Sequence, residues 1–145
     1  MIIDFEGEPQ KSIDERRAKH SPMKDVAGTL RSFNYAMHVA VDQACANRPE
    51  TRGAFEKHGR AWEAEVRNAF LNAYREHSDM DIAFGPAGNA AALLDMFTLE
   101  KACYELRYEL GNRPEWVHVA LRGVLESLSP PLVEEREPAL ATSGN

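Results

Sequence analysis

Four runs of apolar residues spaced three and four positions apart constrain this 145-residue chain more than any other feature. That spacing places the apolar side chains of each run on one face of an α-helix. Residues that disfavour helix stand between the runs, as in Asn47-Arg48-Pro49 and Gly85-Pro86. The pattern predicts helices over residues 24–47, 52–77, 90–110 and 114–128, and therefore a mainly α protein.

The four apolar faces are expected to pack into one bundle. The large side chains expected to be mostly buried in it are Leu30, Phe33, Trp62, Phe70 and Leu121. Around the helical region, residues 24–128, the sequence predicts an N-terminal segment over 1–23 and a flexible tail over 129–145. The N-terminal segment begins with a short strand at Met1–Ile3 and includes a turn of helix around Ile13–Arg17.

Composition narrows the classes of function. The chain carries 23 acidic and 17 basic side chains, and its net charge of −6 argues against binding to nucleic acid. It has no run of about 20 apolar residues that could cross a membrane, and its start lacks the basic and apolar character of a signal peptide. Two cysteines, Cys45 and Cys103, are too few for a disulfide framework or a zinc site. We therefore expect a cytoplasmic protein.

Three acidic residues follow the predicted strand at alternate positions: Asp4, Glu6 and Glu8. A carboxylate at the end of an apolar strand lies where the backbone leaves the core. Such a carboxylate can hold Mg²⁺ through its oxygens while the metal bridges nucleotide phosphates. The alternative is an acidic surface turn with no ligand.

A fourth acidic residue, Asp25, stands near the start of the first long predicted helix. A carboxylate in that position accepts backbone N–H hydrogen bonds and interacts favourably with the helix dipole. From the pattern alone, Asp25 is therefore interpreted as a first-turn acid.

A mixed aromatic and polar group ends the third predicted helix. Tyr104 and Tyr108 fall on one face, and Asn112, Arg113 and Trp116 follow at the same end. Sugars are bound by such mixtures, because polar groups reach the hydroxyls while an aromatic ring covers the apolar side. Half-buried packing is the alternative for the tyrosines, and an ion pair with Glu109 or Glu115 is the alternative for Arg113.

Three blocks of the sequence resemble a known family. The segments IIDFEGEP, ERRAKHSPMKDVAGTLRSFNYA and LEKACYELRYELGNRPEWVHVALRGV resemble the C-terminal lobe of bacterial maltokinases. These enzymes have a protein-kinase-like fold of the aminoglycoside-phosphotransferase type, and many are fused to a trehalose synthase domain. The resemblance implies a helical C-lobe, with residues 1–23 forming one border of the catalytic cleft.

The resemblance also implies roles for individual residues. Asp4 matches the aspartate that binds Mg²⁺ and ATP, with Glu6 as a further metal contact and Glu8 bordering the substrate. Asp25 matches an aspartate that supports the catalytic loop. The maltose pocket is implied to include Tyr104, Tyr108, Asn112, Arg113 and Trp116.

Two parts of a complete maltokinase have no match in the 145 residues: the N-terminal nucleotide lobe and the HGDLHxxQ catalytic loop, which supplies the base. The chain is therefore expected to be a fragment that is inactive alone. Its expected partners are maltose, the missing lobe and a trehalose synthase domain. Two functions remain open: part of an ATP-dependent maltose kinase of trehalose and glycogen metabolism, or a non-catalytic helical module that binds a sugar or a partner.

Overall fold

The computed structural model describes residues 12–78 and 90–129, and this part of the chain is 89% helical with no strand. It confirms a mainly α protein. The elements are α1 (Ile13–Arg17), α2 (Met23–Cys45), η1 (Pro49–Thr51), α3 (Arg52–His77), α5 (Ala90–Asn112), η2 (Pro114–Trp116) and α6 (Val117–Leu128). The expected strand Met1–Ile3 and nearly all of the expected tail lie outside the described residues. None of the described helices is sufficiently long and apolar to traverse a membrane.

The helix boundaries follow from the tetrapeptide Asn-Arg-Pro-Glu, which occurs at 47–50 and again at 112–115. Arg48 and Arg113, each preceding a proline, adopt nearly the same non-helical backbone, with φ −145° and ψ 68° or 70°. Each proline then opens a single 3₁₀ turn that leads into the next helix. The fourth helix was expected to begin at residue 114, but because of this turn it begins at Val117.

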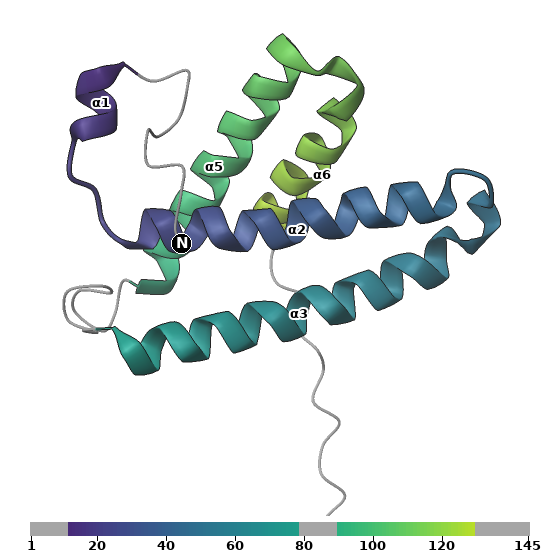
Figure 1. Ribbon diagram of the computed structural model, residues 1–145, viewed down its shortest axis with the longest axis horizontal. Coiled ribbons are helices and arrows are strands. Elements are labelled where there is room, and N and C mark those ends of the chain that lie inside the picture. The colour runs from purple at the N-terminus through teal and green to yellow at the C-terminus, as the bar shows by residue number, and fades with distance from the viewer. Residues whose placement is uncertain (1–11, 79–89, 130–145) are drawn as a thin grey trace, which may run out of the picture.

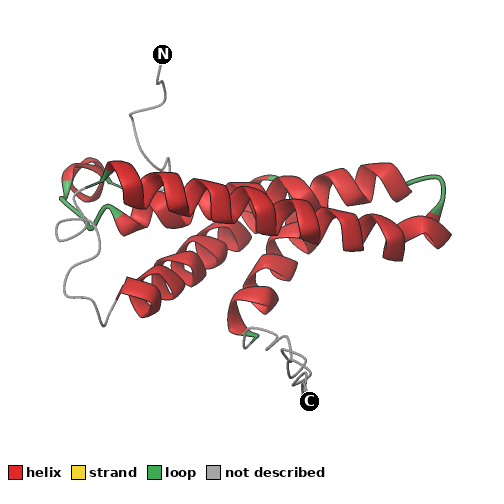
Figure 2. Cartoon of the chain, turned by 90° about the horizontal axis from the view of Figure 1, so that it is seen from below, coloured by secondary structure: helices red, strands yellow, loops and turns green. Residues whose placement is uncertain are grey.

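Helix α2 is the centre of the fold. It packs against α3, α5 and α6, while α5 and α6 also pack against each other. Figure 1 shows α2 and α3 running side by side, with the α5–α6 pair crossing α2. In the perpendicular view of Figure 2, α5 and α6 extend to one side of the long α2–α3 pair.

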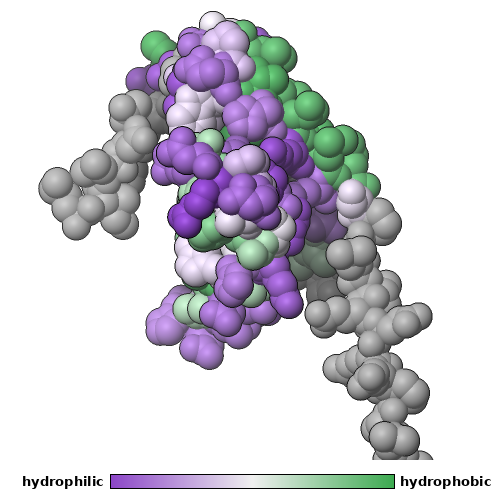
Figure 3. Space-filling view, turned by 90° about the vertical axis from the view of Figure 1, so that its right-hand side faces the viewer, coloured by the Kyte–Doolittle hydropathy of each residue, from purple (hydrophilic) through white to green (hydrophobic). Residues whose placement is uncertain are grey.

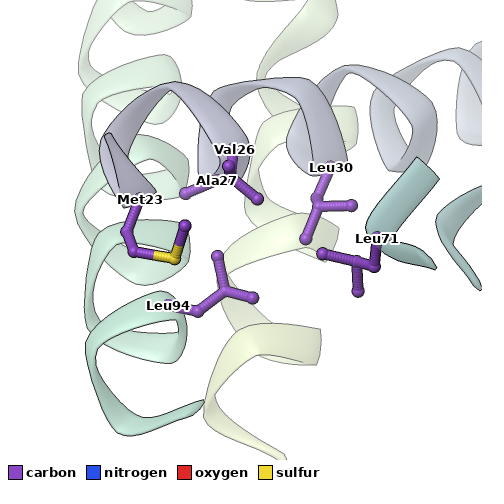
Figure 4. Close-up of a cluster of buried hydrophobic side chains, with 6 residues drawn as sticks. All are labelled: Met23, Val26, Ala27, Leu30, Leu71 and Leu94. Carbon is purple, nitrogen blue, oxygen red and sulfur yellow. The ribbon is translucent and has the colours of Figure 1, made fainter. Parts of the chain in front are cut away.

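The main core lies where the N-terminal half of α2 meets α3 and α5. Figure 4 shows its six buried side chains: Met23, Val26, Ala27, Leu30, Leu71 and Leu94. A smaller cluster, Met37, Val41 and Cys45, continues along α2. Gly59 of α3 lies against it, and a Cβ at this position would be 2.9 Å from Met37 Cγ. This close approach of the Met37 side chain to the α3 backbone needs a residue without a side chain at position 59.

The expected burial of large side chains is confirmed only in part. Leu30 is 2% exposed, and Phe33 and Phe70 are half-buried in an edge-to-face pair with ring centroids 6.0 Å apart. Trp62 and Leu121 are each 44% exposed, so their expected burial is wrong. Leu125 and Leu128 of α6 are exposed as well, and Figure 3 shows a continuous hydrophobic strip along one edge of the molecule. The periodicity predicted that this face of α6 is buried, but none of the described helices covers it.

These exposures predict different costs for two leucine truncations. Leu30→Ala removes side-chain atoms from a closed core and should lower the free energy of unfolding by about 2–4 kcal/mol. Leu121→Ala should cost less than about 1 kcal/mol, because its side chain already contacts solvent. Urea unfolding of both variants measures the difference. Equal losses would show that the two positions are equally buried in solution.

Candidate functional site

Of the four acidic residues expected near the catalytic cleft, the structure describes only Asp25. Asp4, Glu6 and Glu8 lie outside the described residues, so the Mg²⁺ and ATP contacts remain predictions. Asp25 lies in the first turn of α2 with an exposed side chain, and its backbone N–H donates to the Pro22 carbonyl at 3.1 Å. This placement agrees with the interpretation of Asp25 as a first-turn acid. The Asp25 side chain is exposed to solvent and is therefore accessible to another segment. Support of a catalytic loop also remains a prediction.

Three residues expected to bind sugar, Tyr108, Arg113 and Trp116, meet Tyr35 and Glu109 around the end of α5. We call these five residues the α5–η2 cluster. Arg113 Nε donates to Glu109 Oε2 at 2.9 Å and Arg113 Nη2 to Glu109 Oε1 at 2.5 Å. The guanidinium carbon lies 5.5 Å from the Tyr108 ring centroid and 5.6 Å from that of Trp116. Of the two ion pairs considered for Arg113, the structure contains the one with Glu109.

A buried carboxylate lies at the centre of the α5–η2 cluster. Glu109 is 2% exposed and also accepts a hydrogen bond from the Tyr35 hydroxyl at 3.0 Å. Burial, followed by the hydrogen bond and negative charge of Glu109, raises the pKa of Tyr35 to about 12. Trp116 stacks on Tyr35 with ring centroids 6.2 Å apart. Arg113 and Trp116 therefore hold η2 against α2 and α5, which makes a packing role the simplest account of both residues.

The other residues expected to bind sugar lie along α5. Tyr104 and Tyr108 stack with ring centroids 6.5 Å apart, and Lys101 Nζ lies 4.9 Å from the Tyr104 centroid. We call these three half-buried residues the tyrosine strip. Asn112 donates through Nδ2 to the Tyr108 carbonyl at 2.8 Å, within its own helix, and is exposed. The tyrosine strip thus combines two aromatic rings with an ammonium group.

The structure also contains a polar network that the sequence did not predict. Its three buried members come from α2: Arg31, Asn34 and His38. Arg31 donates from Nε and Nη2 to Glu105 Oε2 at 3.1 and 2.7 Å, and from Nη1 to Asn34 Oδ1 at 2.6 Å. We call these three residues and the carboxylates that they contact the α2 polar network.

Two further carboxylates complete the α2 polar network. Asn34 Nδ2 donates to Glu63 Oε1 at 2.9 Å and to Glu126 Oε2 at 2.8 Å. His38 Nε2 lies 3.1 Å from the same Glu126 oxygen, and Arg60 pairs with Glu126 Oε1 at 3.0 Å. The network thus ties α2 to α3, α5 and α6. No local motif predicted it, since the carboxylate partners of Asn34 lie 29 and 92 residues away.

Two carboxylates have strongly lowered pKa values. Burial opposes ionisation of Glu126, but hydrogen bonds with His38 and Asn34 and the charge of Arg60 outweigh it and lower the pKa to about 2. Burial likewise opposes ionisation of Asp42. Hydrogen bonds with Arg52, His118 and Arg122 prevail there and lower its pKa to about 2. These carboxylates join α2 to α6, and Asp42 also joins α2 to α3.

These lowered pKa values predict a loss of stability in acid. A carboxylate whose pKa is lower when folded stabilises the fold above its unfolded pKa, and this contribution disappears as pH falls toward 2. For Glu126, the change from 4.5 to about 2 corresponds to about 3 kcal/mol, which its partial exposure to solvent reduces. Urea unfolding at pH 5.5 and pH 2.5 should therefore show a smaller acid-induced loss for Glu126→Gln than for the unsubstituted chain. Identical losses would contradict the assignment.

Within residues 12–78 and 90–129, no group of three His, Cys, Asp or Glu side chains could hold a metal ion.

No protein-family model matches the chain. Over 121 residues it is 29% identical to a glucosamine kinase from Streptacidiphilus jiangxiensis, an alignment that covers 81% of the chain and 25% of the kinase. The chain spans about a quarter of that relative's length, and the similarity indicates a distant, sugar-kinase-like relationship.

Proposed function

We propose that the chain is the helical part of an ATP-dependent sugar kinase and contributes to binding of the acceptor sugar. The observation that carries this proposal is the similarity to a glucosamine kinase over 121 residues. The three sequence blocks that resemble maltokinases support maltose as the acceptor and maltose 1-phosphate as the product. The reaction would then supply glycogen synthesis from trehalose.

The proposed reaction is in-line transfer of the γ-phosphoryl group of ATP to the anomeric hydroxyl of the sugar. Asp4 and Glu6 would hold Mg²⁺, which offsets the charge of the phosphate groups. Asp25, exposed at the start of α2, would support the catalytic loop. The base and the nucleotide lobe would come from another part of the kinase, which makes an N-terminal lobe and a trehalose synthase domain the proposed partners.

The tyrosine strip supports sugar binding by this part of the kinase. The stacked rings of Tyr104 and Tyr108 provide an apolar surface for one side of a pyranose ring, with the Lys101 ammonium beside it. Asn112 is exposed at the same end of α5. Glu8 is proposed to add an acidic contact to the sugar. Arg113 contributes to this surface through its packing against Tyr108.

The exposed leucines of α6 favour a second candidate function. Leu121, Leu125 and Leu128 are 44–63% exposed and recur at helical spacing. Such a face is typical of a helix that binds another protein surface. A non-catalytic module that binds a partner would use this face and would not require ATP.

A coupled ADP-release assay tests the kinase proposal. The polypeptide from the complete reading frame that carries this chain should turn over ATP in the presence of maltose, whereas the 145-residue chain alone should not. Tyr108→Ala should raise the KM for maltose by about tenfold with a smaller change in kcat, because a stacked ring mainly supplies uniform binding. Phe55→Ala, an exposed aromatic on α3, is the matched control and should leave both constants unchanged. Sugar-independent ATP turnover, or an unchanged KM in Tyr108→Ala, would contradict the proposal.

A further inference from the structure

A cavity of about 730 Å³ lies between α2, α3, α5 and α6, and no residue of the tyrosine strip lines it. Its charged lining consists of three guanidinium groups and three carboxylates: Arg31, Arg60, Arg67, Glu63, Asp95 and Glu126. The charges are therefore balanced. Because the volume lies within the range of about 300–1,000 Å³ typical of small-molecule sites, the cavity is large enough for a mono- or disaccharide.

The polar side chains of α2 that line the cavity are held in place by hydrogen bonds to other helices. Arg31 and Asn34 are 2% and 8% exposed, and each is fixed by hydrogen bonds to carboxylates on other helices. Gly123 of α6 makes this arrangement possible, because a Cβ there would overlap the Arg31 guanidinium. A binding surface that is held in place before the ligand arrives loses less conformational entropy on binding.

The polar groups of the lining suit a ligand that carries many hydroxyls and no charge. Guanidinium groups only donate hydrogen bonds and ionised carboxylates only accept them, whereas a hydroxyl does both. An anion would meet three carboxylates, and Glu126 stays ionised at neutral pH because its pKa is about 2. A cation would meet three guanidinium groups. We propose that this cavity binds an uncharged mono- or disaccharide.

The cavity site is distinct from the tyrosine strip. Asp95 and Thr98 line it from the N-terminal half of α5, whereas Tyr104 and Tyr108 belong to the C-terminal half. The proposal goes beyond the kinase function, since it assigns a second carbohydrate site that does not require phosphoryl transfer. Binding to the cavity and turnover of ATP can therefore succeed or fail independently.

The test is a titration of the ¹⁵N-labelled 145-residue chain with glucose and with maltose, followed by NMR. We expect at least one sugar to bind with a Kd of about 0.1–10 mM and to shift the amide signals of Asn34, Glu63 and Gly123. Arg67→Ala and Asp95→Ala should each weaken binding by about fivefold or more, because each removes a lining charge that lies outside the α2 polar network. Both residues are at least partly exposed, so the variants should retain the helical circular dichroism of the unsubstituted chain.

Tyr108→Ala and the charged probes distinguish the alternatives. Tyr108→Ala should leave the shifts of the cavity amides unchanged. Loss of those shifts in Tyr108→Ala but not in Arg67→Ala would overturn the proposal. Preferential binding of inorganic phosphate or of glucosamine at the cavity would also overturn it, because the cavity would then select a charge. Absence of any shift with either sugar up to about 50 mM would have the same consequence.

Discussion

Replacing Glu109 by alanine is expected to lower the free energy of unfolding by about 3–5 kcal/mol. The carboxylate is buried, accepts two hydrogen bonds from Arg113 and receives a third from the Tyr35 hydroxyl. Its removal leaves three donor groups, two of Arg113 and one of Tyr35, without their acceptor and weakens the connection between α2, α5 and η2. Since domains of this size are commonly stable by only about 5–15 kcal/mol, the variant should be close to unfolding.

Urea unfolding followed by circular dichroism measures this loss. Glu100→Ala is the matched control, because Glu100 lies on the same helix and forms a surface ion pair with Lys24 at 2.8 Å. That pair is partly exposed, so its loss should cost less than about 1 kcal/mol. A Glu109→Ala variant as stable as the Glu100→Ala control would show that the α5–η2 cluster does not hold the helices together.

The second large effect is expected at Asp4 in the proposed complete kinase. Asp4→Asn preserves the shape of the side chain but removes the charge proposed to bind Mg²⁺. Because negative charge develops on the transferred phosphoryl group, loss of metal positioning should reduce kcat by about 100-fold or more, with a much smaller effect on the KM for maltose.

Steady-state kinetics with ATP and maltose varied separately measures this effect. Glu65→Gln, at an exposed position on α3, is the control and should behave as the unsubstituted enzyme. Near-normal kcat in Asp4→Asn at saturating Mg²⁺ would favour the alternative that Asp4, Glu6 and Glu8 form an acidic surface turn with no ligand. The metal role of Asp4 would then be wrong.

The helices were predictable because their signals are local. Apolar spacing and the two Arg-Pro steps determine the ranges of α2, α3, α5 and α6 to within a few residues, and a capping box at Ser12 and Glu15 accompanies the short α1. Burial was less predictable, because it depends on which face of a helix finds a neighbour. Leu30 meets α3 and α5, whereas Leu121 has the same apolar character but remains exposed.

The polar interior could not be predicted from periodicity. Arg31, Asn34 and His38 recur at spacings of three and four, as core residues do, but polar side chains at those positions are normally assigned to the solvent face. Their burial depends on Glu63, Glu105 and Glu126, which belong to three other helices. Conversely, the aromatic residues near Arg113 were correctly placed together, but Trp116 packs on Tyr35, a partner 81 positions away that the local pattern did not include.

The chain is proposed to belong to an enzyme that transfers phosphate from ATP to a sugar. The most direct measurement is ³¹P NMR of the complete reading-frame product incubated with ATP, Mg²⁺ and maltose. We expect consumption of ATP, formation of ADP and a new phosphate signal coupled to an anomeric proton, as in maltose 1-phosphate. If no sugar phosphate forms from maltose, glucose or glucosamine while the protein remains folded, the claim is wrong.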